Sequence, residues 1–272
     1  MTTIEQLAGI TAQHNEIVKR VANGSLDAEQ VKDSLQAIIE KREPRGITIA
    51  TSHQRFQSES SMPDWYVSPE QQLERVTQLN RQRDWGFEES DFPAIPEGAS
   101  LRDGEVLLLC VYLPTKGRKS GLYRTIDELW DAYEAPSRYI KRRWSELKAE
   151  PKLVRQAPGY TYTPGIRWVV FNPNSYHGKS PEQALELAKQ DNVQLAGVEG
   201  LMANLLFPAW ATSWNGTSGP YPWLTGLQYK DQADWSLSLC FYRWDDDRQV
   251  NFSAHWSDFV FSVFGSPSFR EC

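Results

Sequence analysis

The sequence predicts an α+β fold, in which an N-terminal αα-hairpin precedes a mixed, largely antiparallel sheet with packed helices. Two helical patterns of apolar residues open the chain. Two nearly continuous apolar segments, 105–113 and 166–171, are typical of strands buried on both faces. Residues 236–256 alternate apolar with small or polar side chains on both sides of a turn, which indicates an antiparallel hairpin.

The pattern divides the 272 residues into three parts. Residues 1–42 are predicted to form the helical hairpin, with Asn23-Gly24 as the stop between its helices. Residues 43–63 are polar and interrupted by proline and glycine, so we expect a linker with at most one edge strand. Residues 64–272 make up the α+β domain. The second helix of the hairpin is acidic, which argues against a DNA-reading helix-turn-helix and favours a docking or dimerising hairpin.

Three helices are expected in the α+β domain. The motif Ser-Pro-Glu-Gln begins helices at Ser68 and Ser180, because serine caps the first amides and proline suits the first helical position. The first of these runs to about Arg83. A helix over residues 125–148 is expected to kink near Pro136 and to turn four side chains toward the core, those of Tyr139, Ile140, Trp144 and Leu147.

The net charge of −6 is unevenly distributed. Residues 115–155 carry 11 Lys or Arg against 6 Asp or Glu, whereas the flanking parts of the chain are acidic. Such a basic middle indicates either a binding face or a solvated helix paired with acidic neighbours.

The composition predicts a cytoplasmic protein. No apolar run approaches the length of a membrane span, and Met1 opens directly into polar residues, so we expect neither membrane contact nor a secretory signal. The three cysteines lack the spacing of a disulfide framework or a metal site. The three adjacent acids at 245–247 occupy a tight turn, which cannot aim three neighbouring side chains at one ion, so no metal site is predicted.

The segment 207–226 is the most informative part of the sequence for function. It combines tryptophan, tyrosine, proline and glycine in a pattern too broken for a long helix or strand. Aromatic side chains on a loop either complete a core or contact a partner. Our leading hypothesis is a non-enzymatic binding or regulatory protein, with a protein partner or self-association through four residues: Trp210, Trp214, Tyr221 and Trp223.

Two alternatives remain open. A nucleic-acid-associated protein would use the basic middle of the chain, where aromatic residues are interleaved with Arg138, Lys141, Arg142 and Arg143. An enzyme acting on a small anionic ligand would use the start of the second Ser-Pro-Glu-Gln helix, with His177, Lys179 and Ser180 around the anion.

Catalytic groups are hard to identify. The four histidines have no partner at a spacing known for metal ligation or nucleophile activation, so we predict no catalytic residue and no cofactor. The prediction therefore leans away from an enzyme without excluding one.

Four phrases of the sequence together resemble a family of uncharacterised bacterial proteins. They are residues 65–73 (WYVSPEQQL), 164–168 (PGIRW), 178–180 (GKS) and 266–271 (SPSFRE). The resemblance spans most of the chain. It implies a bacterial, cytosolic origin and assigns no activity, partner or site residue.

Overall fold

The computed structural model describes residues 62–272 except for four short gaps, at 137–138, 216–218, 232–233 and 245–247. The chain divides after Ser61, and the unit Met62–Cys272 contains every described residue. The predicted hairpin 1–42, most of the predicted linker and the acidic turn lie outside the described residues.

The described part contains both helices and strands. Its helices are α3 (Pro69–Arg83), a short 3₁₀-helix η1 (Glu89–Asp91), α4 (Gly121–Ala132), α5 (Pro181–Asp191), α6 (Val198–Leu206) and α7 (Trp210–Ser213). Its strands are β1 (Val106–Tyr112), β2 (Ile140–Arg143), β3 (Val154–Gln156), β4 (Gly165–Asn172), β5 (Gln194–Leu195), β6 (Tyr221–Asp231), β7 (Asp234–Trp244), β8 (Gln249–Trp256), β9 (Phe264–Gly265) and β10 (Ser268–Glu271).

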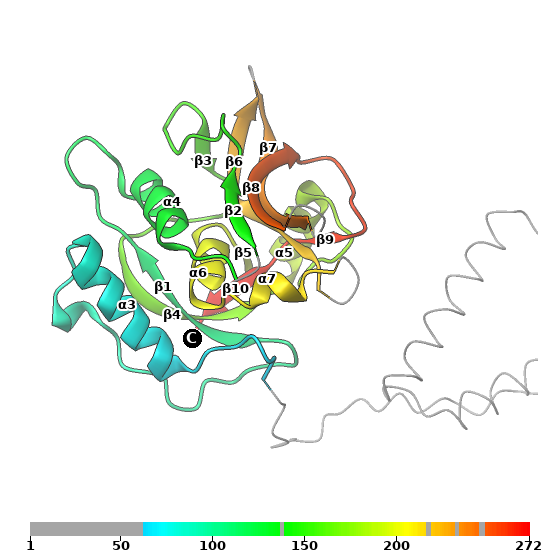
Figure 1. Ribbon diagram of the computed structural model, residues 1–272. Coiled ribbons are helices and arrows are strands. Elements are labelled where there is room, and N and C mark those ends of the chain that lie inside the picture. Colours follow the sequence, from blue (N-terminus) through cyan, green and yellow to red (C-terminus); the bar gives the residue numbers. More distant parts are fainter. Residues whose placement is uncertain (1–61, 137–138, 216–218, 232–233, 245–247) are drawn as a thin grey trace, which may run out of the picture. The chain divides into compact units, whose positions relative to one another are not determined.

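The strands form two sheets (Figure 1). The first has four strands in the order β1-β4-β10-β5, and all its pairs are antiparallel. The second has six strands, with the order β2-β8-β7-β6-β3 and β9 beside β6. Its β2–β8 and β6–β9 pairs are parallel, and the others are antiparallel. The α+β class with a mixed, largely antiparallel sheet is therefore confirmed for the described residues.

Helix α6 links the two sheets. It contacts β1 of the first sheet, β6 of the second and helix α4, and all nine of its residues are buried. Figure 1 shows it at the centre of the domain. A helix with apolar residues around most of its circumference is expected in such a position, because no face of it meets water.

The free edge of the first sheet is closed by a side chain of α3. Strand β1 is buried along its whole length, as its apolar sequence predicts. Gln72 of α3 accepts a hydrogen bond from the Leu109 amide at 2.9 Å and donates one to the Leu107 carbonyl at 3.0 Å. The amide side chain thus satisfies backbone groups that an edge strand otherwise leaves unpaired.

Both predicted Ser-Pro-Glu-Gln helix starts are confirmed, with complete capping boxes.

The predicted helix over 125–148 is wrong. Helix α4 ends at Ala132, and Ile140–Arg143 forms the edge strand β2, which pairs with β8. Ile140, expected in the core, is 69% exposed. The spacing of Tyr139, Trp144 and Leu147 suits a helix, but Pro136 prevents the helix from continuing. Beyond it, pairing with β8 satisfies the backbone hydrogen-bonding groups.

The segment 207–226 is more regular than its composition suggests. It contains the short helix α7 and the first residues of β6, an eleven-residue strand. Gly226 lies within that strand, and an added Cβ there would stand 2.7 Å from the Leu195 carbonyl oxygen. The glycine is required by this close backbone approach, so here it does not mark a loop.

Candidate functional site

The aromatic residues predicted to form a contact surface lie mostly in the core. Trp210, Trp214 and Trp223 are buried, and Tyr221 is half-buried. The Trp214 ring stacks on Phe241 at a centroid distance of 6.0 Å. The expected exposed surface is therefore corrected: these rings complete the core, because the large apolar area of a tryptophan is stabilised by removal from water.

The residues of the small-anion alternative do not form an anion site. At the start of α5, the Gln183 amide donates to Ser180 Oγ at 3.2 Å, and the Glu182 amide donates to the Ser257 carbonyl at 3.3 Å. Pro181 has no N–H to donate. The first-turn donors are thus used within the protein, while the His177 and Lys179 side chains are exposed.

The basic residues predicted to bind nucleic acid have three different roles. Lys141 Nζ donates to the Trp130, Asp131 and Tyr133 carbonyls and so caps the end of α4. Arg143 donates to an Asp127 oxygen at 2.6 Å and to the Leu147 carbonyl at 2.8 Å. Arg142 is exposed and donates to Gln249 at 3.4 Å. Arg138 lies outside the described residues.

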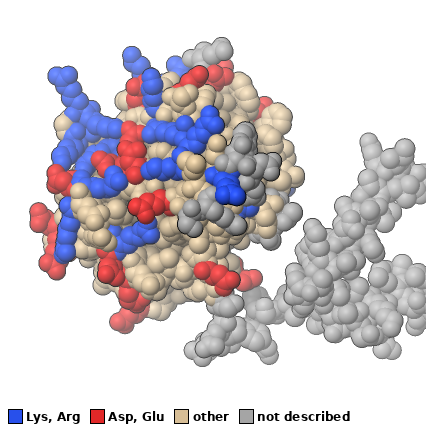
Figure 2. Space-filling view, viewed as in Figure 1, with Lys and Arg blue, Asp and Glu red and all other residues tan. Residues whose placement is uncertain are grey.

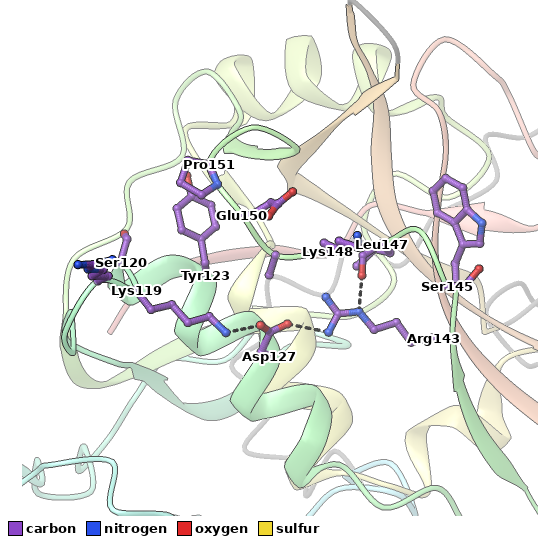
Figure 3. A pocket seen from close by; sticks show the side chains of 13 residues that line it. Lys119, Ser120, Tyr123, Asp127, Arg143, Ser145, Leu147, Lys148, Glu150 and Pro151 are labelled. Carbon is purple, nitrogen blue, oxygen red and sulfur yellow. Dashed lines mark hydrogen bonds and ion pairs between the residues drawn. The ribbon is translucent and has the colours of Figure 1, made fainter.

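A pocket of about 700 Å³ nevertheless lies within the basic middle of the chain (Figure 3). Its lining comes from residues 118–120, from α4, and from the end of β2 with the segment that follows it. It consists of Arg118, Lys119, Ser120, Tyr123, Asp127, Arg143, Trp144, Ser145, Leu147, Lys148, Ala149, Glu150 and Pro151. The volume falls within the range of about 300–1,000 Å³ that small-molecule sites occupy. Figure 2 shows Lys and Arg side chains gathered on part of the surface in the same view as Figure 1.

The wall formed by residues 143–150 is held in place by core contacts. Leu147 is buried, its amide donates to the Trp144 carbonyl at 3.0 Å, and its carbonyl accepts from Arg143. The Tyr229 hydroxyl donates to the Glu146 carbonyl at 2.6 Å, and its ring lies 5.8 Å from that of Trp144. The backbone of this wall is therefore fixed before any ligand arrives, which lowers the entropy cost of binding.

Positive charge exceeds negative charge in the pocket. Four lining residues are cationic and two are acidic. Asp127 is shared between Lys119 and Arg143, so its charge is already compensated (Figure 3). Arg118 and Lys148 are exposed, and neither has an ion pair or side-chain hydrogen bond with the described residues. These two cations are available to an anion.

Two aromatic side chains give the pocket apolar walls. Tyr123 and Trp144 are both half-buried, so part of each ring reaches the pocket. Burial raises the pKa of Tyr123 further above neutral pH, so its hydroxyl stays a hydrogen-bond donor. The Ser120 side chain does not cap α4, and the Gly121 amide at the start of this helix donates instead to Thr115 Oγ1 at 3.2 Å.

A second cluster of ionisable groups surrounds Glu199 and is separate from this pocket. Glu199 is buried and accepts hydrogen bonds from the Tyr112 hydroxyl at 2.5 Å, the Tyr160 hydroxyl at 3.2 Å and the Gly197 amide at 2.9 Å. Burial raises the pKa of Glu199 and, more strongly, that of both tyrosines. Glu199 does not line the pocket, and its hydrogen bonds join α6 to β1. An acidic residue within the mainly apolar sequence of α6 is a signal for such a buried cluster, and the sequence analysis does not identify Glu199.

An exposed apolar surface lies on a different segment of the chain from the predicted one. Among the described residues, four of the six exposed large apolar side chains fall within 256–263. They are Trp256, Phe259, Val260 and Val263. This apolar segment follows β8 and covers Trp223, whose ring lies 6.2 Å from that of Phe261.

The described residues include no group of three His, Cys, Asp or Glu that could hold a metal ion. No helix in this part of the chain combines the length and apolar character needed to cross a membrane. No protein-family model matches the chain, and comparisons with curated proteins and with solved structures gave no match either.

Proposed function

We propose that this chain is a non-enzymatic binding protein that holds a phosphate-bearing ligand in the pocket of residues 118–151. The observation that carries the proposal is the pair of cations, Arg118 and Lys148, which have no partner among the described residues and lie in a pocket with an excess of positive charge. The proposal keeps the binding role and the bacterial, cytosolic setting expected from the sequence, and it moves the contact surface to the basic middle of the chain.

The chemistry of the lining favours an anion over a neutral ligand. Arginine and lysine are the residues that most often recognise phosphate, arginine through paired N–H donors and lysine as a point charge. Tyr123 and Trp144 add faces on which a planar group can stack. Together they suit a ligand with a phosphate at one end and an aromatic ring at the other.

The same lining argues for binding without chemistry. It includes no histidine and no cysteine, and the carboxylate of Asp127 is already engaged by two cations. General acid–base catalysis works best with a group whose pKa lies near the operating pH, and histidine is the side chain most often used. The remaining carboxylate, Glu150, is exposed, so water solvates its charge.

The proposal is tested with Arg118→Ala/Lys148→Ala and adenosine monophosphate as the probe. We expect the wild-type protein to bind the probe in isothermal titration and the double variant to bind about tenfold more weakly, since two exposed charge-assisted contacts of up to about 1 kcal/mol each are removed. The control, Lys179→Ala/Lys189→Ala, removes two exposed lysines from the region of α5, of which Lys189 is paired with Glu186. Weaker binding by the control alone would favour the α5 site and overturn the proposal, as would no binding by the wild type.

Asp127→Asn is expected to change the affinity in the opposite direction. Removing this carboxylate frees Lys119 and Arg143 for a ligand, so we expect the affinity for adenosine monophosphate to rise several-fold. A titration at two salt concentrations checks this, because an electrostatic gain shrinks as salt rises. A loss of affinity would mean that Asp127 contacts the ligand or holds the pocket open.

A second candidate function is self-association through the apolar segment 256–263. Large exposed apolar patches mark interaction sites, and this segment contains one charged residue, Asp258, so two copies would meet with little like-charge repulsion. We expect sedimentation of the full chain to show a concentration-dependent dimer that Phe259→Ser/Val260→Ser removes. A monomer at all concentrations would exclude this role.

A further inference from the structure

We infer that the ligand of this pocket is a single strand of nucleic acid, which continues from the pocket over Trp144 and Ser145 into a second hollow. The inference rests on the proposed function and specifies its ligand. It is motivated by the position of the second hollow and by the side chains that the two hollows share.

The second hollow, of about 230 Å³, lies next to the pocket. Its lining is Arg142, Arg143, Trp144, Ser145, Tyr242, Asn251, Phe252 and Ser253. Arg143, Trp144 and Ser145 line both hollows, so these residues form the boundary between them. A ligand that filled both would have to pass over this boundary at the end of β2.

The second hollow repeats the chemistry of the first. Arg142, Asn251 and Tyr242 are neighbours across β2, β8 and β7, since Arg142 pairs with Asn251 and Asn251 pairs with Tyr242. An arginine, an amide and an aromatic ring therefore line one row of the sheet. Arg142 is exposed, and its one described hydrogen bond is to the neutral side chain of Gln249, so its charge is not compensated there.

Cations and aromatic rings thus line both hollows, so they lie along one path. From the pocket outward, the path passes Lys148 and Tyr123, then Trp144, then Arg142 and Tyr242. Proteins that bind single strands combine a cationic groove along the backbone with rings on which unpaired bases stack. An acidic peptide would use the cations without the rings, and a duplex hides its base faces, so both fit the path less well.

The experiment compares fluorescence anisotropy of labelled oligothymidylates of increasing length with the binding of adenosine monophosphate. We expect affinity to rise with length until both hollows are filled and then to level off. Arg142→Ala should weaken binding of the longer oligonucleotides about tenfold and leave the mononucleotide unaffected, because Arg142 lines only the second hollow. Arg142→Lys should restore much of the loss. In Arg142→Ala, the slope of log affinity against log salt should become shallower by about 0.7, the contribution of one phosphate contact to a single strand.

The outcomes separate this inference from the proposed function. Mononucleotide binding without a gain from length, or without an effect of Arg142→Ala on long strands, would overturn the strand inference and leave the pocket intact. Equal binding of a duplex or of polyglutamate would also overturn it, because the rings would then contribute nothing. Failure of both the mononucleotide and the strand to bind would remove the proposed function as well.

Discussion

Replacing Trp214 by alanine is expected to lower the free energy of unfolding by about 3–5 kcal/mol, the usual cost of removing a large aromatic side chain from a core. Trp214 is fully buried, lies edge-on to Trp210 at 5.3 Å and stacks on Phe241 at 6.0 Å. Its removal leaves a cavity beside two rings that α7 and β7 hold in place, so the site has little freedom to collapse.

The matched control for this variant is Trp256→Ala. Trp256 is 50% exposed, so its loss is expected to cost much less, about 1 kcal/mol or below. Urea unfolding followed by circular dichroism measures both variants. Equal, small losses would show that Trp214 does not lie in the core, and the predicted aromatic contact surface would have to be reconsidered.

Glu199→Ala is expected to have the second largest effect, a loss of about 3 kcal/mol or more. The substitution leaves the Tyr112 and Tyr160 hydroxyls and the Gly197 amide without their buried acceptor. Each buried donor that loses its partner costs about 1–3 kcal/mol. Tyr112→Phe serves as the comparison, since it removes one hydrogen bond and keeps the carboxylate, and should cost less. An unchanged free energy of unfolding in Glu199→Ala would show that this cluster does not stabilise the fold.

Glu199 should also make stability depend on pH. Burial raises the pKa of Glu199 above its unfolded value of about 4.3, so the folded state holds its proton to a higher pH than the unfolded state does. The resulting stabilisation is present at pH values below the unfolded pKa and is lost as pH rises through the folded pKa. As pH rises from the unfolded pKa through the folded pKa, the wild type should therefore lose unfolding free energy relative to Glu199→Gln. A difference that stays constant with pH would contradict the assignment.

The local patterns in the sequence predict the elements whose residues decide their own structure. Strands β1 and β4 are nearly continuous apolar runs, and the starts of α3 and α5 are fixed by serine caps and proline, so these predictions are confirmed. Strand β2 could not be predicted in this way. Its backbone is paired with β8, more than a hundred residues later, and no local pattern records that pairing.

Charge counting found the segment that forms the pocket but selected different side chains. The excess of Lys and Arg in 115–155 is visible in the sequence. Lys141 caps a helix and Arg143 pairs with Asp127, whereas Arg118 and Lys148 have no described partner. Which cations are consumed inside a fold depends on tertiary contacts, and the sequence alone does not contain that information. The burial of the loop tryptophans is unpredictable for the same reason.

The central claim is that residues 118–151 bind a phosphate-bearing ligand, and the most direct test is to locate that ligand by amide chemical-shift mapping. We expect titration with adenosine monophosphate to shift the amides at the start of α4 and along residues 143–150, with Ser120, Tyr123 and Lys148 among the largest changes. Shifts concentrated at the start of α5, or no shift at saturating concentrations of the probe, would contradict it.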